Sequence, residues 1–404
     1  KIIKKNDFMK NDLIILAGGR GLRLKKYTKK IPKPLLKVNK ISMIENILNQ
    51  FSRYDFNKIY ILTGYKGNLI KKKIHKKIFN FNEITCLKEK KLLGTGGGIK
   101  KNLHLFSDKF FVINADSYCD FEFNKFQSIN LRSNLGIILL VKNSNYKSNK
   151  KLSNLSVYKK KVFFKKKSNY MNGGIYFLKK KCFQVKNFNE KISLEEQIIA
   201  PLIKKNKILG FKSNNFFIDI GTEKNYKKSK NLISKNLRRP AVFIDRDGTI
   251  NEDIGYLHKI KNLKFKSNIL KTLNYLSKKK IYLFIVTNQA GIGKKIFTLK
   301  QFNKFHKKLK EIFIKKKIFI DEVIYSPYHP KAKIKKYKKK SLYRKPGNLM
   351  IENLMKRWEV LRNKSIFIGD QTSDERAAKK SNIEFFYYKK NIFNKIKEKF
   401  NNYS

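Results

Sequence analysis

Short apolar runs that end in glycine or aspartate recur along this chain, and helical patterns separate them. The first run leads into the glycines of LAGGRGLRL (16–24), and AVFI (241–244) leads directly into Asp245 and Asp247. Further strands are predicted at 58–64, 109–116, 135–141, 173–178, 216–221, 281–289, 321–326 and 365–370, and helices at 42–51, 194–205, 268–279 and 299–315. Strands that alternate with helices predict an α/β fold with mainly parallel sheets covered on both faces.

The pattern starts twice within 404 residues, which is enough length for two ordinary domains. The polar and basic stretch KKSKNLISKNLRRP (227–240) separates the two starts. We therefore predict an N-terminal domain over 1–232, a linker over 233–239 and a C-terminal domain over 240–404. The first is expected to be a Rossmann-like sandwich, and the second is also expected to be an α/β sandwich.

The cellular location is predicted from three negative observations. The longest apolar run, LGIILLV (135–141), is much shorter than the roughly 18 residues that span a membrane. The start of the chain lacks the apolar stretch of a secretory signal. Three cysteines lie far apart, without the spacing of a disulfide framework or a metal site. We expect a cytoplasmic protein with free thiols and no membrane partner.

The formal net charge is +66, from 95 Lys and Arg against 29 Asp and Glu. A nucleic-acid-binding protein is one interpretation, because basic side chains release phosphate counterions when they bind. The basic residues run through the whole chain, however, and arginine, which reads bases in a bidentate manner, is sparse beside lysine. We expect a solvated lysine surface that binds polyanions non-specifically at low salt, and nucleic-acid binding stays the weaker alternative. An oligomer is left open.

A glycine-rich turn follows the first predicted strand. Glycines let the backbone approach a ligand, so that its N–H groups can cradle phosphates. In PKPLLKV (32–38) two prolines hold Lys33 in an extended loop, where its point charge suits a phosphate. Each feature alone is common, so the prediction depends on the combination.

The combination resembles the signature of the sugar-1-phosphate nucleotidyltransferases, over roughly residues 11–230. The motifs occur in the family's order: LAGGRGLRL (16–24), PKPLL (32–36), LLGTGGGI (92–99), VINADS (112–117), NGGIYFL (172–178), SLEEQIIAPLI (193–203) and FIDIGTEKNY (217–226). This family joins a sugar 1-phosphate to a nucleoside triphosphate and releases pyrophosphate.

The resemblance implies roles for the matching residues. The triphosphate would be held by Gly18, Gly19, Gly21, Arg23 and Lys33, with Arg23 and Lys33 also catalytic. The base and sugar site would be shaped by Gly94, Thr95 and Gly96, and the sugar would be contacted by Asn172, Gly173 and Glu195. Mg²⁺ would be held by Asp116 and Asp219, since carboxylate oxygens are its usual ligands and its charge helps two anions to meet.

One departure from the family concerns the lysine that meets the sugar phosphate. Many members carry a Glu-Lys pair shortly before the NGG segment. This chain reads VFFKKKSNYMNGG (162–174) there, without a Glu. One of Lys165, Lys166 and Lys167 is expected to serve, and the sequence leaves the choice among them open.

FIDRDGTIN (243–251) places two scarce acids at the tip of an apolar strand. Carboxylates at positions i and i+2 of an extended segment lie on the same side, which predicts one site for Asp245 and Asp247. The stretch resembles the DxDGT signature of the haloacid dehalogenase superfamily. Its other parts follow in order: Thr287 in IVTNQAG (285–291), Lys345 in YRKPG (343–347) and IGDQTSD (368–374).

By that resemblance, Asp245 is the nucleophile that takes the phosphoryl group. Asp247 would protonate the leaving oxygen and then activate water. Mg²⁺ would be held by Asp245, by the backbone carbonyl of Asp247 and by Asp370, with Asp374 in support. Phosphoryl oxygens would be bound by Thr287 and Lys345, and the substrate by Asn288 and Arg344.

The local sequence is similar to one branch of this superfamily, which contains heptose bisphosphate phosphatases and histidinol phosphatases. DRDGTIN, TNQAGIG, YSPYHP and RKPG carry this similarity. A loop in that branch usually holds a structural zinc on cysteines and a histidine. The matching positions here are Ser326, Tyr328, Ser341 and Tyr343. None of these is a usual zinc ligand, so no structural zinc is predicted.

Together, the two resemblances predict a bifunctional enzyme of nucleotide-activated heptose biosynthesis for cell-surface lipopolysaccharide. The phosphatase would remove the 7-phosphate of D-glycero-D-manno-heptose 1,7-bisphosphate through an aspartyl-phosphate. The transferase, whose LGTGGGI and NGGIYFL words resemble heptose 1-phosphate guanylyltransferases, would then add a nucleotide, with GTP as the favoured donor. The same chemistries on other substrates stay open: a hexose 1-phosphate with UTP or CTP, and histidinol phosphate or another phosphomonoester.

Overall fold

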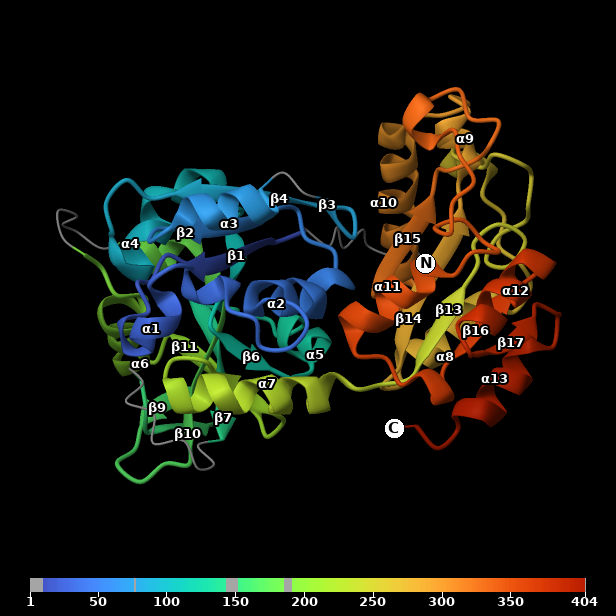
Figure 1. The fold of residues 1–404 in the computed structure, drawn as a ribbon. Helices are drawn as coiled ribbons and strands as arrows, with labels where there is room; N and C mark the ends of the chain where they lie inside the picture. The colour runs from blue at the N-terminus through green and yellow to red at the C-terminus, as the bar shows by residue number, and fades with distance from the viewer. Residues whose placement is uncertain (1–9, 76–77, 143–151, 185–190, 404) are drawn as a thin grey trace. The chain divides into compact units, whose positions relative to one another are not determined.

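The computed structural model describes residues 10–75, 78–142, 152–184 and 191–403. The chain divides into two compact units, Lys1–Leu48 with Phe56–Ile233 and Asn49–Asp55 with Ser234–Ser404. Each unit contains strands and helices arranged around its own sheet (Figure 1). The predicted α/β class is therefore confirmed.

A mixed sheet forms the centre of the first unit. Its strand order within the described residues is β3 (Ile78–Phe79), β4 (Asn82–Lys88), β2 (Ile59–Thr63), β1 (Asp12–Ala17), β5 (Lys109–Asn114), β10 (Tyr170–Lys179), β7 (Gly136–Lys142), β11 (Ile208–Ser213), β9 (Lys161–Phe164) and β8 (Leu155–Tyr158). From β4 to β11 the strands share one direction except β10, which is antiparallel to both of its neighbours. The centre of the sheet is thus mainly parallel, as predicted.

One predicted strand of this unit lies outside the main sheet. The segment predicted at 216–221 forms only β12 (Phe217–Asp219), which pairs antiparallel with β6 (Ser117–Cys119). This register puts Asp219 opposite Ser117. The small sheet therefore carries Asp219 to the carboxyl end of β5, where Asp116 follows the strand.

Helices cover both faces of the first sheet. They are α1 (Lys25–Thr28), α2 (Met43–Ser52), α3 (Gly67–Ile74), α4 (Gly94–Lys101), α5 (Phe123–Gln127), α6 (Ala200–Lys204) and α7 (Glu223–Leu237), with short turns η1 (Leu22–Leu24), η2 (Lys33–Leu35), η3 (Leu103–Leu105) and η4 (Lys180–Phe183) and the π-helix η5 (Leu194–Ile199). Val112 of β5 packs in one core with Ile99 of α4 and Leu194 of η5. Phe111 faces the other way, and its ring lies 4.9 Å from that of Phe123 in α5.

A parallel sheet forms the second unit. Its order within the described residues is β15 (Glu322–Ser326), β14 (Tyr282–Asn288), β13 (Ala241–Ile244), β16 (Ile366–Gly369) and β17 (Glu384–Tyr387), which can be followed across Figure 1. Its helices are α8 (Ile269–Ser277), α9 (Ala290–Gly293), α10 (Leu299–Lys315), α11 (Leu349–Trp358), α12 (Thr372–Lys380) and α13 (Ile392–Phe400), with turns η6 (Ile260–Asn262), η7 (Lys335–Tyr337) and η8 (Arg362–Lys364). All four strand pairs are parallel, as predicted.

Alternate residues of β13 enter different cores, because side chains alternate across a strand. Val242 and Ile244 pack with residues of α8, α10 and α13. Ala241 and Phe243 pack with residues of α11 and α12. Since both faces are covered, β13 is apolar throughout, and polar residues can begin only where the strand ends at Asp245.

The predicted linker at 233–239 is mostly helical, because α7 continues to Leu237. Ile233 is fully buried and Leu237 is 8% exposed, so these apolar side chains keep the helix packed. Only Arg238 and Arg239 separate the helix from Pro240 and β13. The polar composition that predicted a linker describes only the exposed side of this helix.

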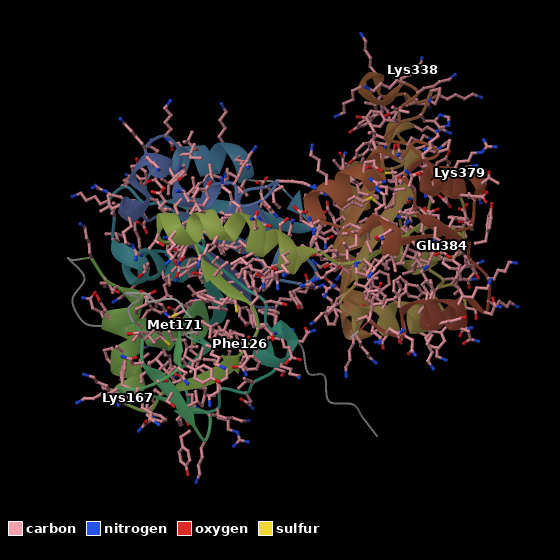
Figure 2. The ribbon with its side chains drawn as sticks, turned by 60° about the horizontal axis from the view of Figure 1, so that its bottom comes forward. Phe126, Lys167, Met171, Lys338, Lys379 and Glu384 are labelled. Carbon is pink, nitrogen blue, oxygen red and sulfur yellow. The ribbon has the colours of Figure 1, made fainter. Side chains whose placement is uncertain are left out.

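The basic residues lie over the surface of both units. Figure 2 shows long side chains projecting around the whole outline, among them Lys167, Lys338 and Lys379, which are all exposed. This distribution agrees with a solvated lysine surface. Among the described residues, no helix has the length and apolar character that a membrane span needs.

Candidate active sites

The glycine-rich loop predicted to cradle a triphosphate follows β1 directly. Gly21 has φ +65°, and a Cβ there would lie 3.0 Å from Thr28 Cγ2, so only glycine fits without strain. A Cβ on Gly64 would lie 2.7 Å from Gly18 O. Gly64, which was not predicted, therefore lets the backbone after β2 approach the backbone after β1. No atom lies within 4 Å of a Cβ built on Gly19, so this part of the loop faces open space.

Two acids and two cations meet beside this loop. Lys33 in η2 is buried, and its Nζ donates to Asp116 Oδ2 at 2.5 Å. A Cβ built on Gly221 would lie 2.7 Å from Asp219 Oδ1 and 3.1 Å from Arg23 Nη2, which places the guanidinium near that carboxylate. The fold therefore collects Arg23, Lys33, Asp116 and Asp219, which are dispersed over about 200 positions of the sequence.

The donor set at this position fits a magnesium ion. Asp116 and Asp219 supply carboxylate oxygens from the ends of two neighbouring segments. Mg²⁺ is usually held by one or two carboxylates, and substrate phosphates and water complete its shell. Lys33 would then contact the phosphates from the same side, because its Nζ already lies at Asp116.

A buried hydrogen-bond network occupies the predicted sugar site. Glu195 in η5 accepts from the hydroxyls of Thr95 (3.1 Å) and Tyr176 (3.2 Å), and Asn172 Nδ2 donates to the Tyr176 oxygen (2.5 Å). Burial and the charge of Glu195 raise the pKa of Tyr176 well above 10, so its hydroxyl stays protonated and donates. Tyr176 was not predicted, because a tyrosine within an apolar strand is more often a core residue.

Three predicted glycines permit close backbone contacts around this network. A Cβ on Gly94, which has φ +78°, would lie 2.4 Å from Ile192 O. Gly96 N donates to the same oxygen at 2.9 Å. A Cβ on Gly173 would come within 3.1 Å of two atoms of β7. These contacts fix the start of α4 and the centre of β10, from which the hydrogen-bonding side chains project.

Glu89 also lies at this site and was not predicted. A Cβ built on Gly98 would lie 2.0 Å from Glu89 Oε1, and one on Gly18 would lie 3.8 Å from Oε2. The carboxylate therefore lies between the glycine loop and α4. Burial raises the pKa of Glu89, although a hydrogen bond from the Leu93 backbone opposes this effect. The sequence KEKKLL (88–93) contains no signal that separates it from a surface residue.

The lysines considered for the sugar phosphate follow β9. Lys165, Lys166 and Lys167 are all exposed. Exposure leaves each of them able to reach an incoming anion, and the three remain equivalent candidates.

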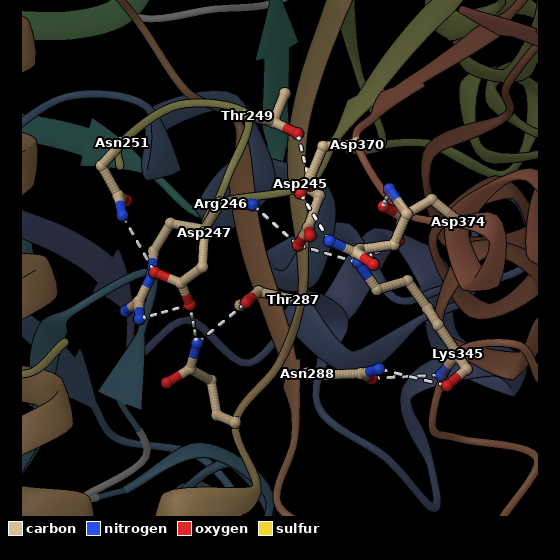
Figure 3. A network of polar contacts seen from close by, with 12 residues as sticks. Asp245, Arg246, Asp247, Thr249, Asn251, Thr287, Asn288, Lys345, Asp370 and Asp374 are labelled. Carbon is tan, nitrogen blue, oxygen red and sulfur yellow. Dashed lines mark hydrogen bonds and ion pairs between the residues drawn. The ribbon is translucent and has the colours of Figure 1, made fainter. Parts of the chain in front are cut away.

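The second site begins where β13 ends. Lys345 Nζ lies 2.8 Å from Asp245 Oδ1 and 2.6 Å from Asp374 Oδ1, and all three residues are buried (Figure 3). Burial, together with the charge of Asp374, raises the pKa of Asp245 to about 7 against the opposing charge of Lys345. Burial acts to lower the pKa of Lys345, but the charges of Asp245 and Asp374 outweigh it and raise the pKa above 10.5. The lysine therefore stays protonated.

Three carboxylates form a candidate metal site here. One oxygen each of Asp245, Asp370 and Asp374 lies within 4.8 Å of the others. A Cβ on Gly248, which has φ +84°, would lie 2.1 Å from Asp370 Oδ2, so only glycine lets the loop approach this acid. The hard oxygen donors fit Mg²⁺. Asp374, predicted only to support the site, is thus also placed as a candidate ligand.

The carboxylate of Asp247 lies outside that metal cluster. Its oxygens accept from Arg246 Nε and Nη2 (3.0 and 2.7 Å), from Asn251 Nδ2 (3.0 Å) and from Gln289 Nε2 (2.8 Å). β13 ends at Ile244, so both acids follow the strand: Arg246 between them lies in a bend, and Asp247 forms an isolated bridge with Asn251. The predicted backbone contact of Asp247 with the metal stays a prediction.

Two neighbouring amides have different partners. Asn288, predicted to contact substrate, pairs through Nδ2 with Lys345 O and through Oδ1 with Lys345 N, both at 3.1 Å. It therefore holds the lysine backbone in place. Gln289 Nε2 donates to Thr287 Oγ1 at 2.9 Å and also to Asp247. Gln289 was not predicted, because its role depends on two side chains from separate parts of the fold.

The loop whose zinc ligands are replaced is held by other contacts. The ring of Tyr328 lies 5.6 Å from that of Tyr337 and 6.4 Å from that of Tyr343. Gly293 O accepts from the backbone of the loop at 2.9 and 3.0 Å. Ser341 Oγ accepts from Tyr343 N. Tyr328 and Tyr343, which stand at two of the usual zinc-ligand positions, thus contribute aromatic packing. The absence of zinc stays a prediction.

Because His306 is buried, we predict that the stability of this unit falls as the pH falls. Burial, reinforced by the charge of Arg246, lowers the pKa of His306 well below 6.5. Below that pH the unfolded chain takes up a proton that the folded protein does not, so the free energy of unfolding falls by about 1.4 kcal/mol per pH unit. His306→Gln keeps an acceptor but cannot titrate, and should reduce this slope between pH 6.5 and 5. Trp358, the only tryptophan, reports unfolding of this unit by fluorescence. Equal slopes would contradict the prediction.

Comparison with known proteins gives a matching family and named relatives for each unit. The family described as "Nucleotidyl transferase" matches residues 12–151, and the family described as "Polynucleotide kinase 3 phosphatase" matches residues 243–402. D-glycero-beta-D-manno-heptose-1,7-bisphosphate 7-phosphatase of Rhodopseudomonas palustris is 34% identical over 151 residues, which are 37% of this chain and 84% of that protein. D-glycero-alpha-D-manno-heptose 1-phosphate guanylyltransferase of Campylobacter jejuni is 32% identical over 215 residues, which are 53% of this chain and 96% of that protein. The solved structure of HddC from Yersinia pseudotuberculosis is 26% identical and covers 55% of this chain and 99% of its own, with a TM-score of 0.46.

The chain belongs to two families: its first unit is a nucleotidyltransferase, and its second is a haloacid dehalogenase-like phosphatase. It is accordingly a bifunctional enzyme that carries a transferase and a hydrolase in one polypeptide. The predicted enzyme classes are confirmed.

Proposed function

We propose that this enzyme removes the 7-phosphate of D-glycero-D-manno-heptose 1,7-bisphosphate and then transfers GMP from GTP to the heptose 1-phosphate. The observation that carries the proposal is the pairing of the two units. A relative of the second unit is named for heptose bisphosphate dephosphorylation, and a relative of the first is named for heptose 1-phosphate guanylylation. The product of the first reaction is a substrate of the second, so one chain would hold two consecutive steps. Three buried free cysteines suit the reducing cytoplasm, where we place both reactions.

The two relatives differ in the anomer that they name. The phosphatase relative is named for the β-anomer and the guanylyltransferase relative for the α-anomer. Hydrolysis at carbon 7 leaves the configuration at carbon 1 unchanged. If both units act in sequence, the phosphatase unit must therefore accept the anomer that the transferase consumes, and we propose the α-anomer.

A group of cations supports a substrate with a second phosphate. Burial and the charges of Lys294, Arg344 and Lys331 lower the pKa of His329. Arg344 is half-buried, and burial lowers its pKa, although the charge of Tyr256 opposes this effect. These cations belong to the segments after β14 and β15 and before α11. The substrate phosphate that is not hydrolysed would bind near these cations and offset their positive charge.

The placement of Asp245, Asp247 and Lys345 supports the following phosphatase reaction. An oxygen of Asp245 attacks phosphorus, the bond to the sugar oxygen breaks, and Asp247 gives that oxygen a proton. Water then attacks the aspartyl-phosphate, gives its proton to Asp247 and releases inorganic phosphate. Thr287 would donate a hydrogen bond to the phosphoryl oxygens, and Lys345 would offset their negative charge. Asp245 and Asp370 would hold Mg²⁺, which would supply further positive charge to these oxygens.

In the transferase unit, Arg23 and Lys33 would hold the triphosphate while the sugar phosphate approaches. An oxygen of the sugar 1-phosphate attacks the α-phosphorus, and the bond to pyrophosphate breaks. Glu195, oriented by Thr95 and Tyr176, would hold the sugar hydroxyls. Asp116 and Asp219 would hold Mg²⁺, which would lower the repulsion between the two anions.

Glu89 supports guanine as the base. Its two carboxylate oxygens can only accept hydrogen bonds while the group is ionised. Guanine presents two adjacent N–H donors, N1–H and N2–H, on its pairing edge. Adenine and cytosine each present a lone pair beside a donor, and uracil flanks its one N–H with two carbonyl oxygens. A half-buried carboxylate would therefore accept two bonds from guanine alone.

Glu89→Gln tests the choice of base. The amide keeps one acceptor and gains a donor, so it should weaken binding of guanine and favour uracil. Loss of one charge-assisted bond corresponds to about a 10- to 100-fold fall in kcat/KM for GTP relative to UTP. Glu83→Gln is the matched control: Glu83 is an exposed acid on β4, the strand that Glu89 directly follows, and its substitution should keep the preference. An unchanged GTP-to-UTP ratio in E89Q would refute guanine recognition by Glu89.

The complete proposal is tested by substrate pairing. The purified enzyme is given the α- or β-anomer of heptose 1,7-bisphosphate with GTP, ATP, UTP or CTP, and products are identified by mass spectrometry. We expect GDP-heptose from the α-anomer with GTP. Formation of nucleotide sugar only from hexose 1-phosphate, with the bisphosphate left intact, would overturn the proposal.

A further inference from the structure

Arg246 is among the largest fully buried side chains of the described residues, with 1% of its surface exposed. It lies between the two acids of the DRD sequence, where an exposed residue would be expected. Its side chain turns back instead, and the guanidinium forms two parallel bonds with Asp247: Nε to Oδ1 at 3.0 Å and Nη2 to Oδ2 at 2.7 Å. Such a bidentate pair fixes the direction of the carboxylate as well as its position.

The remaining sides of the guanidinium are also occupied. Nη2 donates to Leu257 O at 3.0 Å, and Nη1 lies 3.0 Å from His306 Nε2. An arginine has only donors, so His306 Nε2 is the acceptor, which agrees with the lowered pKa of this histidine. The ring of Phe305 lies 5.0 Å from the guanidinium carbon. Helix α10 thus supplies a fixed support against which Arg246 cannot turn.

We propose that Arg246, supported by His306, is a positioning residue that aligns the carboxylate of Asp247 for proton transfer to the leaving oxygen and from the attacking water. This inference rests on the role of Asp247 in the proposed function. Asn251 and Gln289 each donate one bond to the same carboxylate, so all of its acceptor positions face a donor (Figure 3). Either single amide can give way to the reacting oxygen while the bidentate pair with Arg246 keeps the orientation.

The role can be measured through the leaving group. A sugar alkoxide leaves only with a proton, whereas p-nitrophenolate leaves readily without one. A general acid contributes about 10²–10⁴-fold to a reaction that needs it. Loss of alignment should therefore slow formation of the aspartyl-phosphate from a sugar phosphate much more than from p-nitrophenyl phosphate.

The experiment compares single-turnover rates of leaving-group release from heptose 1,7-bisphosphate and p-nitrophenyl phosphate, using the full chain. Arg246→Met should lose about 100-fold on the sugar phosphate and less than about 10-fold on the aryl phosphate. Arg246→Lys, which keeps the charge without the two parallel bonds, should show a smaller selective loss. Asp247→Asn should show the full selective loss, and adding Arg246→Met to it should produce no further selectivity.

Arg357→Met is the matched control, because Arg357 pairs with Glu322 in the same unit and away from Asp247. It should leave the ratio of the two rates at the wild-type value. Equal losses on both substrates in folded Arg246→Met and Arg246→Lys, or a selective loss that multiplies with that of Asp247→Asn, would overturn the proposal. If Asp247→Asn itself shows no selectivity, the role assigned to Asp247 fails first, and the two failures are distinguished.

Discussion

Asp245→Asn is expected to abolish phosphate release while the same protein continues to transfer nucleotides. The amide is a poor nucleophile and cannot form the aspartyl-phosphate, so a loss of about 10⁴-fold or more is expected, as for other enzyme nucleophiles. The fold should persist, because Asn keeps the shape of a side chain whose ionised form is disfavoured by burial. Release of inorganic phosphate and formation of pyrophosphate, measured on one preparation, report the two activities separately.

Asp253→Asn is the matched control for this variant. Asp253 is an exposed acid eight positions after Asp245, and its Oδ1 accepts from Gly255 N, a bond that an asparagine can also accept. Both activities should remain within about twofold of wild type, as is usual for a surface substitution. Hydrolysis of the bisphosphate by the Asp245→Asn protein at the wild-type rate would remove Asp245 from the mechanism.

Asp116→Asn is expected to produce the opposite pattern, with transfer lost and hydrolysis retained. Asp116 is the partner of Lys33 at 2.5 Å and a candidate Mg²⁺ ligand, so the substitution removes the negative charge that both of these cations would face. Metal ions contribute several kcal/mol to charge stabilisation in the transition state, which corresponds to about 10²–10⁴-fold in rate. Pyrophosphate release with saturating Mg²⁺ measures the loss.

Asp108→Asn is the control at the opposite end of β5, where Asp108 is exposed. It should leave transfer unchanged. A mixture of the Asp245→Asn and Asp116→Asn proteins should convert heptose bisphosphate to nucleotide sugar, since each supplies the activity that the other lacks. Full transferase activity in Asp116→Asn would show that Asp219 alone suffices to hold the metal.

Much of the fold followed from local pattern. Each predicted strand and helix is present, because apolar runs of strand length and amphipathic helical runs bury surface in only one way. The features that the sequence did not predict concern elements whose partners are distant: β12 pairs with β6 outside the main sheet, and α7 continues to Leu237. In both cases the structure of the segment depends on the distant elements that it packs against, and its own composition does not specify these elements.

The residues of the two candidate sites also divide into those that the sequence predicted and those that it did not. The aspartates, Lys345 and the glycine loop were predicted, because motif spacing around strand ends reflects the chemistry that these residues perform. Glu89, Tyr176 and Gln289 were not predicted, since each resembles an ordinary surface or core residue in sequence. Their roles arise from contacts with Gly98, Glu195 or Asp247, which are made only in three dimensions.

The sequence by itself determined the two enzyme classes and indicated the acids of each candidate site, because strand-end motifs combine backbone geometry and chemistry within a few residues. Only the tertiary structure decided how those acids are held. Arg246 could have faced solvent, and a packed helix with a neutral His306 instead fixes it on Asp247. Side-chain direction after a strand ends is set by packing against distant elements, and no local periodicity predicts it.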